Sequence, residues 1–220
     1  MRKTKLTFAC IVGTRGCFSA ELARTGRKQL LDAIKQSRAR YWGDAERHRR
    51  GRLDIGAARQ EIVAAALLRL DVQAPPLARE IADAYALERE QTVRPFPGAI
   101  EALQRLRDQG IRLALITNGS GEVQRRKLDR FGLTPLFDCI LIEGECGVGK
   151  PDERVYRSAL AQLGVEPEEA WMVGDHLEWD VDVPQRLGIL GIWLDFAGAG
   201  LPQASAVRPD RITRSLGELV

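Results

Sequence analysis

The sequence has few of the features that mark disulfide-rich, membrane or nucleic-acid-binding proteins. It has four cysteines, Cys10, Cys17, Cys139 and Cys146, and none forms the close C-x-x-C pair of a zinc site. No run approaches the roughly 18 consecutive apolar residues of a membrane span. Charge of one sign is also missing, since Lys+Arg 33 nearly balance Asp+Glu 30, and no aromatic residues are interleaved with the arginine clusters. These absences argue against a disulfide scaffold, a membrane protein and a nucleic-acid platform.

The N-terminal segment admits two interpretations. Three basic residues precede the apolar run Leu6 to Val12, and the later FSA resembles a small-residue cleavage site, so a secretory signal peptide is one alternative. The run is short for a signal peptide and contains Thr7, and its β-forming residues end at Gly13. We interpret it as a buried strand and expect a cytoplasmic protein.

Residues from Glu21 to about Glu90 are rich in Ala, Leu, Arg and Glu, which favour helices. Gly51, Gly56 and the pair Pro75-Pro76 are expected to break this region into separate helices. The predicted helical stretches are Glu21–Tyr41, Ala57–Leu70 and Leu77–Glu90.

After Pro95, short apolar stretches alternate with helical ones, which predicts a parallel sheet with helices on both faces. The expected architecture is an α/β fold, a doubly wound parallel sheet formed by residues 1–20 and 95–220. A small helical domain, residues 21–94, is inserted after the first strand. The expected strands include Arg112–Ile116, Cys139–Ile142, Ala170–Val173 and Leu190–Leu194, and the expected helices are Ile100–Gln109, Gly121–Phe131, Glu153–Leu163 and Trp179–Leu187.

In such a sheet, ligands bind beyond the carboxyl ends of the strands. The strand RLALIT ends in Thr117, Asn118, Gly119 and Ser120, which offer a hydroxyl and backbone N–H groups to an anion just before a helix. Thr, Asn and Ser are also common helix caps, so a purely structural role is an open alternative for this stretch.

Two carboxylates follow the strand AWMV. Asp175 stands at the strand end, and Asp180 comes about a helical turn later. Such a pair can hold a hard cation that keeps most of its waters, as Mg²⁺ does beside a phosphate. One of the two carboxylates could instead cap the next helix, and for Asp180 this alternative stays open. His176 and Glu178 are interpreted as bystanders.

The stretch EGECGVGKPD places Gly144, Gly149 and Lys150 at the spacing of a nucleotide-binding P-loop. A P-loop needs Ser or Thr after the lysine to hold Mg²⁺, whereas Pro151 has no hydroxyl. Because Pro favours the first turn of a helix, the stretch predicts a loop that delivers Lys150 to the sheet edge as a point charge for a phosphate.

Taken in order, ALITNGS, GVGKPDERVY and MVGDHLEWDV resemble the second, third and fourth motifs of the haloacid dehalogenase (HAD) superfamily, in its phosphatase-like branch. The helical insertion looks like that family's small cap domain. The resemblance implies a Mg²⁺-dependent phosphatase for a small phosphomonoester, working through an aspartyl-phosphate. It also implies that Thr117, with Asn118 beside it, and Lys150 bind phosphate, and that Asp175, supported by Asp180, binds the metal.

The first motif of that family, D-x-D-x-T, is not matched. No Asp occurs before Asp32, and the closest stretch, Cys10 to Thr14, has Cys10 and Val12 at the two carboxylate positions. Val12 supplies neither a nucleophile nor a general acid. A thiol at Cys10 would be mostly protonated at neutral pH, and Mg²⁺ prefers oxygen ligands.

Two hypotheses follow. The first is a phosphatase of this superfamily whose first motif is altered in this sequence. The second is a catalytically impaired descendant that still binds Mg²⁺ and phosphate or acts as a scaffold. Pro151 argues against a P-loop protein. A small phosphorylated metabolite is the expected partner, with no nucleic acid and no membrane, while the exact substrate and the oligomeric state are open.

Overall fold

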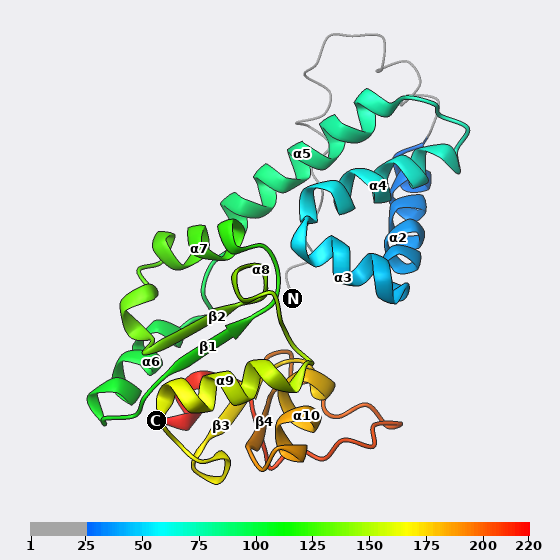
Figure 1. The fold of residues 1–220 in the computed structure, drawn as a ribbon. Coiled ribbons are helices and arrows are strands. Elements are labelled where there is room, and N and C mark those ends of the chain that lie inside the picture. The colour runs from blue at the N-terminus through cyan, green and yellow to red at the C-terminus, as the bar shows by residue number, and fades with distance from the viewer. Residues whose placement is uncertain (1–25) are drawn as a thin grey trace. The chain divides into compact units, whose positions relative to one another are not determined.

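The computed structural model describes residues 26–220. The predicted first strand at Leu6–Val12, the alternative signal peptide, and the positions Cys10 and Val12 lie outside the described residues. The chain divides into two compact units between Val93 and Arg94, and each is described by itself below. The helical unit comprises residues 26–93, and the α/β unit comprises residues 94–220 (Figure 1).

The described part of the helical unit consists of helices joined by short connections, as the composition predicts. Gly51 and Gly56 were expected to break helices, and this expectation was wrong, because Gly51 lies inside α3 and Gly56 inside α4. Pro75 begins a helix, where its missing N–H costs nothing. The helices are α2 (Arg27–Gly43), α3 (Ala45–Leu53), α4 (Ile55–Leu68) and α5 (Pro75–Thr92).

Local signals explain where these helices begin, and apolar packing holds them together. The side chains of Asp44 and Asp54 accept hydrogen bonds from backbone N–H groups in the first turns of α3 and α4. Leu30, Leu67 and Leu77 form the core between α2, α4 and α5, and full burial of each such side chain is worth about 1.5–3 kcal/mol. In residues 26–220, no helix combines the length and the apolar character that crossing a membrane requires.

The α/β unit alternates strands and helices along the chain. Its strands are β1 (Ala114–Thr117), β2 (Cys139–Ile142), β3 (Trp171–Gly174), β4 (Leu190–Leu194) and β5 (Arg211–Thr213). Its α-helices are α6 (Ala99–Asp108), α7 (Gly121–Arg130), α8 (Glu143–Cys146), α9 (Glu153–Leu163) and α10 (Val183–Arg186). A π-helix, η4 (Leu177–Asp182), precedes α10, and the 3-10 turns are η2 (Thr134–Leu136), η3 (Pro167–Glu169) and η5 (Leu216–Leu219).

All strand pairs in the described residues are parallel, which confirms the predicted α/β fold. β1 pairs with β2, and β4 lies between β3 and β5. The register aligns the ends of neighbouring strands, since Thr117 is opposite Ile142 and Gly174 is opposite Trp193. Within each of these two sheets, the side chains that follow paired strands therefore lie at the same edge, where an open parallel sheet binds ligands.

One core holds the α/β unit together. It joins Leu141 of β2, Val155 and Tyr156 of α9, and Val183 of α10, and Met172 of β3 packs against it. Helix α9 begins after Asp152, whose side chain caps the N–H of Arg154, and it ends at Gly164, whose φ of 63° is left-handed. The loop before α9 is thereby tied to the core beneath the strand ends.

Candidate active site

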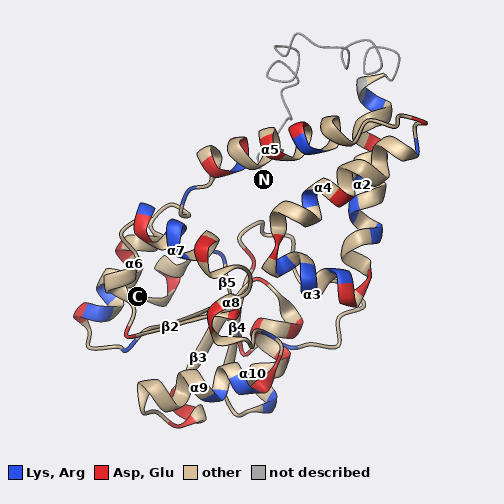
Figure 2. Cartoon of the chain, turned by 45° about the horizontal axis from the view of Figure 1, so that its top comes forward, with Lys and Arg blue, Asp and Glu red and all other residues tan. Residues whose placement is uncertain are grey.

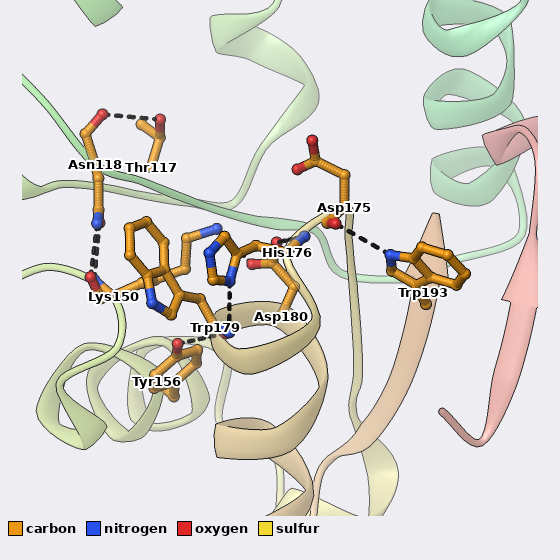
Figure 3. Close-up of polar contacts among 9 residues, drawn as sticks. All are labelled: Thr117, Asn118, Lys150, Tyr156, Asp175, His176, Trp179, Asp180 and Trp193. Carbon is orange, nitrogen blue, oxygen red and sulfur yellow. Dashed lines mark hydrogen bonds and ion pairs between the residues drawn. The ribbon is translucent and has the colours of Figure 1, made fainter. Parts of the chain in front are cut away.

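Thr117 and Asp175 come from the ends of β1 and β3, and Figure 3 shows them on either side of the side chain of Lys150. The Thr117 hydroxyl lies 3.5 Å from the carbonyl oxygen of Asn118. This separation is too long for a strong hydrogen bond. The hydroxyl is thus available to donate to another oxygen.

The loop that carries Lys150 is locked to the end of β1 by Asn118. The side-chain amide nitrogen of Asn118 donates to the Lys150 carbonyl at 2.6 Å, and the Lys150 N–H donates to the Asn118 side-chain oxygen at 2.8 Å. This reciprocal pair uses both ends of the carboxamide. The Asn118 side chain therefore positions Lys150, and its predicted contact with phosphate stays a prediction.

The Lys150 amine is held by a buried carboxylate. Its Nζ lies 2.6 Å from Oδ1 of Asp180, whose side chain is 2% exposed. The second oxygen, Oδ2, accepts from the backbone N–H of His176 at 3.0 Å. Because both carboxylate oxygens have partners, the buried charge is compensated, and the amine is held in one place.

Gly174 makes this placement possible. A Cβ atom at residue 174 would lie only 2.3 Å from Cγ and Oδ2 of Asp180. No side chain fits in that space, so the glycine lets Asp180 reach Lys150 beneath the strand end. The two residues of the G-D pair thus have different roles. Gly174 leaves room for the side chain of Asp180, and Asp175 supplies a carboxylate at the strand end.

Asp175 is exposed, and its carboxylate has no hydrogen-bond or ion-pair partner in the described part of the chain. Its backbone carbonyl accepts from the indole N–H of Trp193 at 3.0 Å, which anchors the residue on β4 (Figure 3).

A Mg²⁺ ion fits the side chain of Asp175 in chemistry, since a free carboxylate at a phosphate site is its usual protein ligand. Residues 26–220 contain no cluster of three or more His, Cys, Asp or Glu side chains suited to a metal. Asp180, the second predicted ligand, gives its oxygens to Lys150 and His176 instead, so its role toward the metal stays a prediction.

Two aromatic side chains of the segment that carries Asp180 stack on each other. The rings of His176 and Trp179 are 4.1 Å apart and nearly parallel, and the backbone N–H of Trp179 donates to Nδ1 of His176 at 3.3 Å. The Tyr156 hydroxyl donates to the Trp179 carbonyl at 2.5 Å. Burial, followed by the nearby negative charge of Asp180, raises the pKa of Tyr156, so this donor keeps its proton. His176 thus caps η4, a structural task.

Glu143 is a site residue that the sequence interpretation missed. It is buried, 6% exposed, and its Oε2 accepts from the backbone N–H of Gly119 at 3.0 Å. That N–H was expected to be open to an anion, and this expectation was wrong for Gly119. The signal was present, because Glu143 directly follows β2, whose end is aligned with that of β1.

A continuous set of hydrogen bonds now links three distant segments. It runs from Asn118 at the end of β1, through Lys150, to Asp180 and His176 after β3. Figure 3 shows the Thr117 hydroxyl and the Asp175 carboxylate near this network. A fixed cation, a hydroxyl and a carboxylate are the kinds of group that a phosphoryl-binding site uses.

A family model for haloacid dehalogenase-like hydrolases matches residues 12–188. The chain belongs to this family. Its fold is that of solved HAD structures, among them the putative HAD-hydrolase YfnB from Bacillus subtilis bound to magnesium, with a TM-score of 0.67, 21% identity and coverage of 92% of this chain and 91% of that one.

Curated relatives of this HAD-like chain are phosphatases. A phosphoserine phosphatase of Thermus thermophilus is 42% identical over 147 residues, which cover 66% of this chain and 57% of the relative. A glyceraldehyde 3-phosphate phosphatase of Methanopyrus kandleri is 35% identical over 118 residues, covering 54% and 51%. The chain thus spans little more than half the length of these relatives. The resemblance to the phosphatase-like branch of the HAD superfamily is confirmed.

Proposed function

We propose that the protein is a Mg²⁺-dependent phosphatase of small phosphomonoesters and that it works at the strand-end site of the α/β unit. One observation carries the proposal: the amine of Lys150 is held by buried Asp180 while the backbone of the same residue is held by Asn118. A cation fixed in this way stabilises the charge on a transferring phosphoryl group without reorganising.

The proposal assigns a role to each residue of the site. Thr117 donates its hydroxyl hydrogen to a phosphoryl oxygen, and Lys150 places its positive charge beside the same group. Asp175 would hold Mg²⁺, and waters and phosphate oxygens would complete its coordination. The ion, when bound, neutralises charge on the phosphoryl oxygens. Asn118 and Asp180 position Lys150.

The relatives support the substrate class. Their names specify phosphoserine and glyceraldehyde 3-phosphate, both small phosphorylated metabolites. A small phosphorylated metabolite as partner, in the cytoplasm, belongs to the same proposal.

The second candidate is a protein that binds Mg²⁺ and phosphate without turnover. It is favoured by the sequence before Asp32, which contains no Asp and has Cys10 and Val12 where the family motif has carboxylates. Covalent catalysis without a positioned nucleophile is not possible. Both candidates use the same site and differ only in the chemical step.

Hydrolysis of p-nitrophenyl phosphate with and without Mg²⁺ tests the first candidate. We expect Lys150→Ala and Asp175→Asn each to lower kcat by about 10²–10³, the effect of removing one electrostatic contact to the transition state. Matched controls are Lys28→Ala and Asp108→Asn, which remove the same charges from exposed residues that are not part of the candidate site and should leave turnover unchanged. Equal activity in Lys150→Ala and Lys28→Ala would contradict the proposed role of the lysine.

Calorimetric titration with Mg²⁺ separates the candidates. Binding that is lost in Asp175→Asn, together with no turnover in the wild type, supports the second. In that case we expect the double variant Cys10→Asp, Val12→Asp to restore hydrolysis. A double variant without activity would contradict the alignment of Cys10 and Val12 with the two carboxylates of the family's first motif. If the protein shows no turnover and also binds no Mg²⁺, both candidates are contradicted.

A further inference from the structure

A cavity of about 180 Å³ lies within the helical unit, between the facing surfaces of α2, α3 and α4. A single water needs about 10–15 Å³ by the same kind of measure, so the space is large enough for a small molecule. Ser37 and Tyr41 line it from α2, Arg47 lines it from α3, and Ile62 lines it from α4.

Ser37 lines this cavity, and its buried hydroxyl has no hydrogen-bond partner in the part of the chain that the structure describes. Ser37 is 5% exposed, and among the described residues its Oγ is the buried side-chain polar atom that makes no hydrogen bond. A hydroxyl buried without a partner costs about 1–3 kcal/mol. Ser37 is one of the residues that line the cavity, so a group bound there is a candidate partner for its hydroxyl.

Three arginines surround the same cavity. Arg40 lies one turn from Ser37 on α2, Arg47 comes from α3, and Arg69 lies just past the end of α4. Glu61 is the sole carboxylate among the lining residues, which leaves a net charge of +2. Figure 2 shows basic residues recurring along these three helices.

The existing ion pairs neutralise only part of this positive charge. Glu61 is shared, with one oxygen 3.6 Å from Nε of Arg47 and the other 3.3 Å from Arg50. Arg69 donates to the neutral side-chain oxygen of Gln36 at 2.6 Å. Arg40 has no ion-pair partner within residues 26–220.

We propose that this cavity binds a small oxyanion, the phosphate or carboxylate group of a small molecule. The guanidinium groups of Arg40 and Arg69 supply charged donors with a planar fork that matches either group. Ser37 donates its hydroxyl hydrogen to the same anion, while Tyr41 and Ile62 offer apolar contact to the remainder of the molecule. The site consists only of helical-unit residues, so it does not depend on the proposed phosphatase activity.

Titration of the full wild-type chain with inorganic phosphate, and separately with acetate, tests the proposal by NMR. We expect the amide signals of Ser37, Ile62 and Ala65 to shift saturably with at least one probe. These three residues line the cavity and belong to the helical unit, whereas the strand-end residues belong to the α/β unit. The stronger probe identifies the preferred oxyanion, and the absence of saturable shifts with both probes would overturn the proposal.

Variants sharpen the test. Arg69→Gln and Arg40→Gln should each weaken binding about tenfold, the usual effect of losing one charge-assisted contact. The control is Arg38→Gln, which removes the same charge from α2 at a position that does not line the cavity. Equal weakening in the control would indicate unspecific attraction and overturn the proposed site.

Ser37→Ala separates binding from folding. Because the hydroxyl has no partner in the free protein, its removal should leave Tm unchanged or raise it. The same change should weaken oxyanion binding several-fold. A variant that binds as tightly as the wild type would exclude Ser37 from the site, and one with a lowered Tm would show that the hydroxyl already has a structural partner.

Discussion

The two units treat buried polar side chains differently. In the α/β unit, Glu143, Asp180, Asp195 and Thr213 are buried, and each one has a hydrogen-bond partner. In the described part of the helical unit, Ser37 is buried and has none. Buried polar groups are normally satisfied inside a protein. The four groups of the α/β unit are already satisfied, whereas the Ser37 hydroxyl is the group that the proposed oxyanion would satisfy.

The two units also differ in how exposed their ion pairs are. Ion pairs on the helical unit, such as Asp32 with Lys35, lie on the surface, and their side chains are at least 42% exposed. An ion pair in such a position is worth little. The Lys150–Asp180 pair is 15% and 2% exposed, where breaking a pair is costly. Stability and site geometry are therefore coupled at the Lys150–Asp180 pair, whereas the exposed ion pairs of the helical unit contribute little to stability.

Among the variants that test this difference between the units, Asp180→Ala should have the largest effect on stability. It leaves the Lys150 amine without its counter-ion, so we expect about 3–5 kcal/mol of destabilisation together with loss of turnover. Asp32→Ala removes an exposed partner in the helical unit and should cost less than 1 kcal/mol. Urea unfolding followed by tryptophan fluorescence and by circular dichroism measures both variants. Similar midpoints would refute the contrast between the units.

Gly174→Ala should rank second. The added Cβ would collide with Asp180 at 2.3 Å, and overpacking of this kind costs about 1–3 kcal/mol. The control is Gly43→Ala at the end of α2, where a Cβ meets no atom within 4 Å and φ is not left-handed. We expect that change to be neutral or slightly stabilising. Thermal unfolding compares the two, and a harmless Gly174→Ala would mean that Asp180 does not need its present position.

Asp152 should show the smallest effect, and it tests whether an exposed pair in the α/β unit behaves like the surface pairs of the helical unit. The side-chain hydrogen bond from Arg154, followed by its backbone N–H, lowers the pKa of Asp152 to about 2 from 3.8. Its contribution is therefore present above about pH 4 and is lost as the pH falls toward 2.

Thermal unfolding between pH 5 and pH 2 measures that loss. Asp152→Asn should reduce the acid dependence of Tm slightly, and Arg154→Gln should reduce it in part, since the backbone donor remains. An acid dependence identical in all three proteins would show that the pair contributes nothing measurable to stability, as is common for exposed pairs.

Much of the fold could be predicted from local patterns. Period and composition placed β2 at Cys139–Ile142 and α9 at Glu153–Leu163 with the bounds that the structure has. The predicted break at Gly51 failed for a non-local reason. A Cβ there would lie 2.8 Å from the ring of Tyr41, so close packing between helices, rather than a break in α3, accounts for that glycine.

For the candidate site, the sequence by itself determined which kinds of groups stand at the strand ends: the hydroxyl of Thr117, the amine of Lys150 and the carboxylate of Asp175. Local order along the chain suffices for this, because a strand end and a helix start are set by neighbouring residues. Only the tertiary structure decided that Asp180 holds Lys150 and that the buried hydroxyl of Ser37, a residue that lines a cavity, has no partner in the described part of the chain. Such partners lie on different elements or meet only when helices pack, and which atoms then come within hydrogen-bond distance depends on the packing of the whole unit.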